Sequence, residues 1–364
     1  MGRREMTALN YAELGAKTLM DKFKPDELPP TDRFHYHQGV YLAGVERVYH
    51  LTGEREYYDY IKAWADHNID EDGNCMGCHL DEFDDIQPAI LLFNLYKTTG
   101  DERYKKVMDT CATATLQWPL NSFGAVWHKY HFPNQMWLDC MYMMGLFSSM
   151  YAKEFDCPKL FDMVYDLMRG MRGHMVNPET GLMYHMYDDS KKANFINPQT
   201  GAVEVHWGRA MGWFVVAIIE ILDYLPSDYS HRQEFIDAEL SLLNALLKYQ
   251  DKETGLWYQV VDKVDDKRNW FETSCSALYT YALAKCMRVG LVDKSYKDIL
   301  IKAYEGVLSK VSVEEDGIFV SDVCIGTGFG DLEFYFARPT VINDLHGMGA
   351  FLLMCTEVYA ALNE

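Results

Sequence analysis

The chain has 364 residues, of which 49% are hydrophobic and 24% are charged. These values are ordinary for a globular protein and exclude disorder over most of the chain. Its 34 basic and 54 acidic residues give a formal net charge of −20. A field of that sign repels nucleic acid and anionic lipid, so we predict neither as a partner. An anionic small substrate would need a local cationic pocket.

The cysteine pattern indicates the compartment. Nine cysteines, an odd number and mostly dispersed, predict reduced thiols and a cytoplasmic protein. The polar N-terminus carries no apolar signal segment, and the longest apolar stretch is interrupted by Glu220 and Asp223, so we expect no membrane span. Cys75-Met76-Gly77-Cys78-His79 fits a c-type haem attachment pattern. No second ligand pair is spaced for zinc, so we predict a plain turn and no metal.

Two alternating sets of helices are predicted from the 3.6-residue periodicity of the apolar residues. Amphipathic helices are expected, in chain order, at residues 9–23, 55–68, 102–115, 157–174, 231–249 and 295–309. More uniformly apolar helices are expected to start near Gln38, Pro88, Gln135, Arg209, Ser274 and Gly347. A helix that is apolar all round is buried, and an amphipathic helix covers it. The repeated Thr-Gly turns at Gly53 and Gly100 separate members of the two sets.

Six buried helices, each paired with an outer one, predict an all-α fold, an (α/α)6 barrel that uses residues 1–364 as one domain. The alternative is an open helical solenoid, but no segment looks like a polar capping repeat. In the barrel the inner helices run parallel, so the residues just before them converge at one rim. Six helix N-termini facing one cavity favour an anion there.

Two carboxylates at these junctions are candidates for acid–base chemistry. Asp139 follows the apolar residues 136–138, and a carboxylate in such a run must be paired, capping or functional. Apolar neighbours and a second carboxylate predict a raised pKa, as a general acid requires. Asp84, four residues before Pro88, is either a helix N-cap or that second carboxylate. The acidic run 81–85 could also bind a metal, but no second acidic motif matches, and a solvated turn is expected.

An arginine between two tryptophans is the second notable pattern. Arg209 and Trp213 are four residues apart on one helix face, and Trp207 comes just before them. This arrangement suits the carboxylate of a ring-shaped ligand. The alternative is an ion pair on an outer face beside packed tryptophans. The glycine run 326–330 lacks a preceding strand and following helix, so it predicts a rim loop and not a nucleotide-binding loop.

At these motifs the chain resembles glycoside hydrolase family 105, the unsaturated rhamnogalacturonyl hydrolases, and more remotely family 88, the unsaturated glucuronyl hydrolases. The resemblance is carried by residues 83–88, 127–129, 135–139, 207–213 and 343–350. It implies an (α/α)6 barrel with Asp139 as general acid/base and Asp84 as its carboxylate partner. It also implies sugar contacts from Tyr36, His128, Lys129, His185, Trp207, Arg209 and Trp213.

The reaction implied by the resemblance is hydration of the C4=C5 double bond of a terminal unsaturated uronate, without metal or cofactor. The expected partner is a small anionic unsaturated oligosaccharide, whose carboxylate Arg209 would hold, with Lys129 as a second cation. Other interpretations of the same residues are an inverting glycosidase or a sugar epimerase, for which His128, His185 and His346 are candidates. A non-enzymatic interpretation is a helical-repeat scaffold that binds a peptide or glycan.

Overall fold

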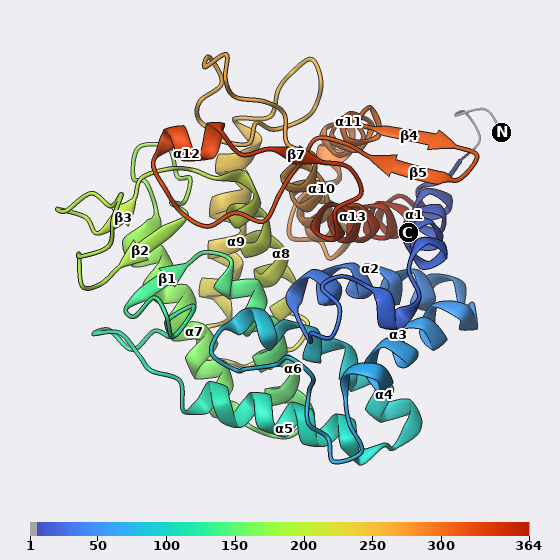
Figure 1. Ribbon diagram of the computed structural model, residues 1–364. Helices are drawn as coiled ribbons and strands as arrows, with labels where there is room; N and C mark the ends of the chain where they lie inside the picture. Colours follow the sequence, from blue (N-terminus) through green and yellow to red (C-terminus); the bar gives the residue numbers. More distant parts are fainter. Residues whose placement is uncertain (1–5, 364) are drawn as a thin grey trace.

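The computed structural model describes residues 6–363, so the first five residues of the polar N-terminus and residue 364 lie outside it. The helices alternate between an inner and an outer ring (Figure 1). The inner helices are α2 (Tyr36–Thr52), α4 (Leu92–Thr99), α6 (Leu146–Glu154), α8 (Gly208–Ile221), α10 (Thr273–Arg288) and α13 (Leu345–Asn363). The outer helices are α1 (Ala8–Lys22), α3 (Arg55–Asn68), α5 (Glu102–Leu116), α7 (Pro158–Met175), α9 (Arg232–Leu247) and α11 (Lys297–Leu308). The (α/α)6 barrel is therefore confirmed.

The inner helices supply most of the core, whereas residues 97–99 at the end of α4 are exposed. All 14 residues of α8 are buried, as expected for a helix with no solvent-facing stripe. Close approach between neighbouring inner helices needs small residues: a Cβ added at Gly349 of α13 would lie 2.6 Å from the Val40 carbonyl oxygen of α2. Gly53 ends α2 at a φ of 72° and donates its backbone N–H to Tyr49, the left-handed C-cap that the sequence predicts.

Short strands replace helix in one place where the sequence predicted an inner helix. Residues 135–137 form β1 (Gln135–Trp137), which pairs antiparallel with β2 (Met186–Asp188), and β2 pairs with β3 (Ala202–Val203). The predicted helix start at Gln135 was wrong, because a short apolar run fits a buried strand as well as a helix. The third inner helical segment begins instead with a π-helical turn, Met141–Gly145, and the second with a 3-10 turn, Gln87–Leu91.

The chain closes the ring with its first and last helices. In Figure 1, α1 lies beside α13, and the hairpin β4 (Val311–Glu314) and β5 (Gly317–Val320) lies against α1. The Ile318 amide donates to Thr18 Oγ1 across this contact at 3.0 Å. A second ribbon, β6 (Val323–Cys324) with β7 (Thr340–Val341), and short helix α12 (Leu332–Phe336) lie in the segment before α13. Helix α13 is long and apolar enough to span a membrane, but 78% of that window is buried, which fits a core helix.

A buried ion cluster occupies the end of the barrel opposite the rim where the inner helices begin. Lys285 and Arg47 both contact the carboxylate of Glu220, which also accepts a hydrogen bond from Tyr281. The side chains of Lys285 and Glu220 are only 1% and 5% exposed. Burial alone would raise the pKa of Glu220, but Arg47 and Lys285 outweigh it and lower that pKa to about 2. The cluster ties α2, α8 and α10 together.

Candidate active site

A cavity of about 350 Å³ opens at the rim where the inner helices begin. The loops and helix starts of different repeats contribute its walls, as the parallel inner helices require. Of the nine residues predicted for the site, only His185 is absent from the lining. The eight that line the cavity are Tyr36, Asp84, His128, Lys129, Asp139, Trp207, Arg209 and Trp213.

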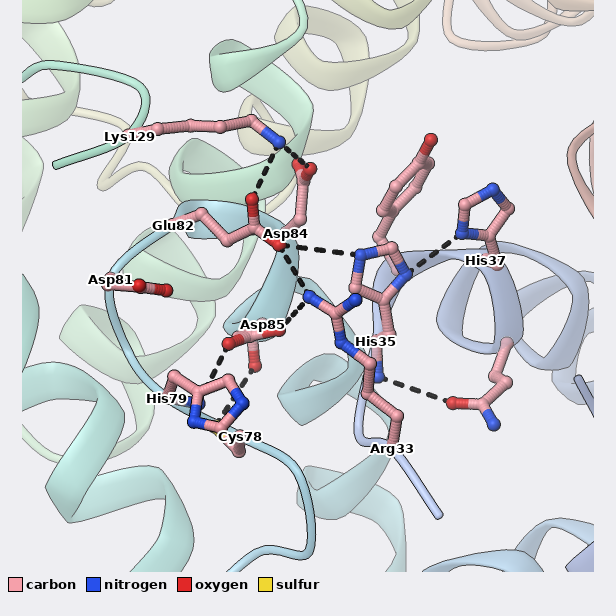
Figure 2. A network of polar contacts seen from close by, with 12 residues as sticks. Arg33, His35, His37, Cys78, His79, Asp81, Glu82, Asp84, Asp85 and Lys129 are labelled. Atoms are coloured by element: carbon pink, nitrogen blue, oxygen red, sulfur yellow. Dashed lines mark hydrogen bonds and ion pairs between the residues drawn. The ribbon is translucent and has the colours of Figure 1, made fainter. Parts of the chain in front are cut away.

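Lys129 bridges two carboxylates on one wall of the cavity. Its Nζ lies 2.6 Å from Asp84 Oδ2 and 2.7 Å from Glu82 Oε2, as Figure 2 shows. Residues 82 and 129 also pair through an isolated β-bridge, which fixes the lysine stem beside the acidic loop. Asp84 is therefore not an N-cap, and His128 Nε2 lies 3.5 Å from its other oxygen. Burial lowers the pKa of His128 to about 4, so this imidazole is neutral at neutral pH.

A chain of polar contacts continues from Glu82 away from Lys129. Arg33 NH2 lies 2.7 Å from Glu82 Oε1, and His35 Nε2 lies 3.6 Å from the same oxygen. His35 Nδ1 in turn lies 2.9 Å from His37 Nδ1. Burial opposes the charge on Glu82, but His35 and Lys129 together hold its pKa well below the ordinary value. Burial lowers the pKa of His37 to about 2, so His37 accepts from or donates to His35 as a neutral ring.

The end of the acidic run is buried, which corrects the expected solvated turn there, whereas the Asp81 side chain is 39% exposed. Asp84 is 6% exposed and Asp85 is fully buried, and Asp85 accepts the backbone N–H of His79 at 2.9 Å. Arg33 balances Asp85 from the other side at 3.5 Å. The expectation failed because it treated the carboxylates as exposed charges, whereas the fold supplies Lys129 and Arg33 as partners from distant segments.

Asp139 lies on the adjacent wall, directly after β1. Its Oδ2 lies 3.2 Å from His185 Nε2, and its side chain is 14% exposed. Burial alone would raise the pKa of Asp139, but its contact with His185 and, to a lesser degree, the nearby His128 outweigh burial and lower it. The raised pKa expected from the sequence is therefore wrong, because an imidazole from another segment of the chain, that of His185, lies against the carboxylate.

His185 stands behind Asp139 and not in the cavity wall. It is fully buried, and its Nδ1 lies 2.6 Å from the Tyr335 hydroxyl. The main chain holds it there, since its carbonyl accepts the Leu138 N–H at 3.0 Å. The implied role of His185 as a sugar contact does not match this position. His185 contacts the carboxylate of Asp139 instead.

Arg209 is a buried cation whose charge is not matched by a contacting carboxylate. The residue is 2% exposed, and its guanidinium donates to the carbonyls of Cys324 and, at 2.6 Å, Ile325. It lies over the Trp207 ring at 4.8 Å from the ring centroid. Among residues 6–363, no carboxylate oxygen lies within ion-pair distance of its nitrogens. An ion pair on an outer face is thereby excluded, and the guanidinium can pair with an anion bound in the cavity.

Aromatic side chains complete the cavity beside Arg209. Trp213 packs on Tyr142 with ring centroids 4.7 Å apart. On the opposite side, the Tyr36 hydroxyl lies 2.8 Å from His346 Nε2, and Asp344 contacts the other nitrogen of His346. Gly326 to Gly328 border the cavity as the predicted rim loop. Aromatic faces beside a buried cation suit a sugar ring that bears a carboxylate.

The comparisons with known proteins identify the family. Residues 11–362 match the model of Glycosyl Hydrolase Family 88. The chain belongs to this family. It is 30% identical over 299 residues to the unsaturated rhamnogalacturonyl hydrolase YesR of Bacillus subtilis (strain 168), covering 79% of this chain and 78% of YesR. It is 24% identical over 317 residues to the unsaturated 3S-rhamnoglycuronyl hydrolase of Formosa agariphila, covering 82% and 80%.

Solved structures extend this result. A family 105 glycoside hydrolase from Clostridium acetobutylicum ATCC 824 superposes with a TM-score of 0.92 at 33% identity, covering 96% of this chain and 99% of that chain. The unsaturated glucuronyl hydrolase of Bacillus sp. GL1 shares the fold, with a TM-score of 0.72 at 13% identity over 96% and 95% of the two chains. The resemblance to families 105 and 88 is confirmed, and the family 88 assignment makes the cavity that of a glycoside hydrolase and not of a scaffold.

One group in the family 88 cavity has the composition of a metal site. Ligand atoms of His35, Glu82 and Asp84 lie within 4.8 Å of one another. Lys129 Nζ already bonds both of these carboxylates, so an ammonium group supplies the positive charge that a metal ion would bring. His35, Glu82 and Asp84 therefore have partners within the protein.

The residues of the site that were missed in the sequence include Arg33, Glu82 and Tyr335. Arg33 and Glu82 connect the acidic loop to the start of α2, and Tyr335 contacts His185 from α12. Glu82 lies inside the acidic run, so its position two residues before Asp84 was a usable signal. Arg33 and Tyr335 stand in segments without a motif, and only the tertiary fold brings them to the cavity.

Proposed function

We propose that this protein releases the terminal 4,5-unsaturated uronate from lyase-generated oligosaccharides by hydrating the C4=C5 double bond. The observation that carries the proposal is a buried Arg209 guanidinium without a carboxylate partner, in the same cavity as the carboxyl group of Asp139. The names of the relatives support this substrate class. A cationic subsite also explains how a chain of net charge −20 binds an anion.

Arg209 is the group that binds the substrate carboxylate in this proposal. The two carbonyls that accept from its guanidinium hold the planar group in place, and the carboxylates of Glu272 and Asp344 act on its charge only from beyond contact distance. Lys129 was expected to assist, but Glu82 and Asp84 already take its ammonium group, so its task is to balance those two carboxylates. The rings of Trp207 and Trp213 confine the sugar beside Arg209.

Asp139 is the proton donor in the first step. The unsaturated uronate is a vinyl ether, so protonation at C4 produces an oxocarbenium-like centre at C5. The bound substrate carboxylate adds a negative charge to the cavity and raises the pKa of Asp139, which favours the protonated acid. The Asp139 carboxylate left after transfer then takes a proton from water as the water oxygen bonds to C5. The resulting hemiketal opens and the glycosidic bond breaks, so the anomeric carbon is never attacked.

Two measurements test the reaction. In heavy water the early product should carry deuterium at C4, detected by mass spectrometry against a product-only control that corrects for slow exchange. The saturated disaccharide, which lacks the vinyl ether, should not be cleaved. An ordinary inverting glycosidase protonates the leaving oxygen and places no deuterium on carbon. Cleavage of the saturated substrate at a comparable rate, without early carbon-bound deuterium, would refute hydration.

The substitution Asp139→Asn tests the proton donor. Asparagine keeps an oxygen that can accept from His185, so the fold should persist, but the group cannot give a proton to C4. We expect turnover to fall by at least about a hundredfold, the usual contribution of a general acid. Circular dichroism of the variant is the control for folding. Near-wild-type turnover by a folded variant would remove Asp139 from this role.

The finer features of the substrate and its setting are also proposals. We propose a substrate from pectin degradation, supported by the name of the Bacillus subtilis relative, an unsaturated rhamnogalacturonyl hydrolase. Unsaturated disaccharides made by pectin, ulvan and glycosaminoglycan lyases, assayed in parallel by loss of ultraviolet absorbance, test this choice. We also propose a cytoplasmic location, supported by the nine cysteines, all of them free thiols. Localisation of a tagged chain by cell fractionation tests it.

A further inference from the structure

A buried chain of three polar side chains leads from helix α12 to the acid–base carboxylate. The Tyr335 hydroxyl lies 2.6 Å from His185 Nδ1, and His185 Nε2 lies 3.2 Å from Asp139 Oδ2. Tyr335 and His185 are both 0% exposed, and only Asp139 borders the cavity. The first two side chains therefore act on a substrate only through the third.

Both outer members of this chain are fixed by their own elements. The His185 amide donates to Val205 at 3.2 Å, and the His185 ring packs against Trp207 with centroids 4.6 Å apart. Tyr335 lies on α12, which begins at the N-cap Asp331, whose side chain accepts the Phe334 N–H at 2.9 Å. The imidazole is thus held between a phenol and a carboxylate.

The geometry determines where the protons are in this chain. The backbone amide of Gly330 faces the Tyr335 oxygen as a donor, and burial raises the pKa of Tyr335 well above its ordinary value. The phenol therefore keeps its proton, and because the Gly330 amide already faces its oxygen, the arrangement favours donation of that proton to His185 Nδ1. A neutral imidazole has one donor and one acceptor nitrogen. With Nδ1 as acceptor, Nε2 carries the hydrogen and donates to Asp139.

We propose that Tyr335 is a positioning residue that holds His185 in its neutral, Nε2-protonated tautomer and so allows Asp139 to carry the catalytic proton. This inference rests on the proposed hydration reaction. If Nδ1 gained a proton, an imidazolium would lie 3.2 Å from Asp139. Its full charge would stabilise the carboxylate, and the acid needed for the first step would be lost.

The remaining groups around Asp139 do not change when the phenol is removed. His128 is neutral at neutral pH, and the charges of Lys129 and Asp84 oppose each other at 2.6 Å. The titratable or charged side chains that face Asp139 or line its cavity are Arg33, His35, Tyr36, His37, Glu82, Asp84, His128, Lys129, Cys140, His185, Arg209, Tyr335 and His346. Of these, only His185 contacts Tyr335 through its titrating ring.

The first test is Tyr335→Phe, which removes one hydroxyl. Without it, His185 Nδ1 is free to take a proton, the pKa of Asp139 falls, and the acid form is lost at lower pH. We expect the alkaline limb of kcat on an unsaturated disaccharide to move to lower pH by about one unit, which is about a tenfold loss of kcat above that limb. The matched control is Tyr41→Phe, whose buried hydroxyl donates to Ala16 at 2.7 Å in the helical shell. A Tyr335→Phe profile that coincides with the wild type would overturn the proposal.

A double substitution shows whether the effect passes through His185. The amide of Gln in His185→Gln can donate to Asp139 but cannot become charged. Adding Tyr335→Phe to His185→Gln should therefore leave the alkaline limb where His185→Gln alone puts it. A further shift as large as in the wild-type background would mean that Tyr335 acts independently of His185, contrary to the proposal.

A measurement without turnover separates this inference from the proposed function. In protein labelled with nitrogen-15 at histidine, the signals absent from His185→Gln belong to His185. At pH 7 they should report the neutral Nε2–H tautomer; an Nδ1–H tautomer or an imidazolium would contradict the inference. This result holds whether or not Tyr335→Phe folds. If the wild type fails to hydrate unsaturated uronates while His185 shows the expected tautomer, the proposed function is wrong and the hydrogen-bonded chain stands.

Discussion

Lys129→Met should destabilise the protein in a way that depends on pH. The ammonium lies 2.6 Å from Asp84 and 2.7 Å from Glu82, and these three side chains are 17%, 8% and 16% exposed. Removing one member of a buried ion pair typically costs about 3–5 kcal/mol. Because Glu82 keeps Arg33 at 2.7 Å, we expect about 2–3 kcal/mol at pH 7. With roughly 2.1 cal/mol/K of unfolding entropy per residue, this is a fall in Tm of about 3–4 °C.

The pH dependence identifies the cause of that loss. The pKa of Glu82 is held below its ordinary value in the fold, so its contribution is complete above the unfolded pKa, about 4.3, and disappears as the pH falls further. Urea unfolding at pH 7 and at about pH 3.5 should therefore show a smaller difference between wild type and Lys129→Met in acid. Lys129→Arg, which keeps the charge, is the control. An equal loss at both pH values would mean that packing by the lysine stem stabilises the fold and that its ion pairs with Glu82 and Asp84 do not.

Substitutions of two buried cationic residues, Arg209 and Lys285, test their roles in binding and in stability. Arg209→Lys keeps the charge but loses the planar guanidinium that donates to the carbonyls of Cys324 and Ile325. We expect kcat/KM to fall about 10- to 100-fold on the unsaturated disaccharide. An equal loss on a carboxyl-reduced analogue would show that Arg209 does not bind the carboxylate. Lys285→Met leaves Glu220 with Arg47 and Tyr281 but without its most buried partner. The free energy of unfolding in urea should fall by about 3 kcal/mol, and a fall below about 1 kcal/mol would contradict a stabilising role for the pair.

The helical framework could be predicted because its pattern is local. All inner segments but the third begin within two residues of the predicted position, the largest differences being Gln38 against Tyr36 and Gly347 against Leu345. Apolar periodicity and glycine C-caps act within a few residues of chain. The third segment differs because residues 135–137 pair with residues 186–188, and no local signal indicates a strand partner at that separation.

The candidate site was predictable as a set of residues and less so as a set of contacts. Because the residues that precede parallel inner helices converge at one rim, Asp84, Asp139 and Arg209 were expected in one cavity, and the structure places them there. The protonation of Asp139 was misjudged because its environment is decided by His185, which reaches it through the β1–β2 pairing. Residue type and spacing indicate which side chains meet at a rim, whereas a pKa depends on individual neighbours a few ångströms away.

The closure of the ring by α1 and α13 determines when this cavity can exist during synthesis. Tyr36, near the start of the chain, bonds His346, which is 310 residues later, and α13 packs against α1, α2 and α10. Each new helical pair can pack on the one made before it, but the last wall of the cavity is translated last. Contacts of such long sequence separation form slowly because the ends of a long loop must meet. A nascent chain stalled before residue 345 would therefore hold Asp84, Asp139 and Arg209 in an open arc of helices, with the apolar sides of α2 and α10 uncovered and in need of a chaperone.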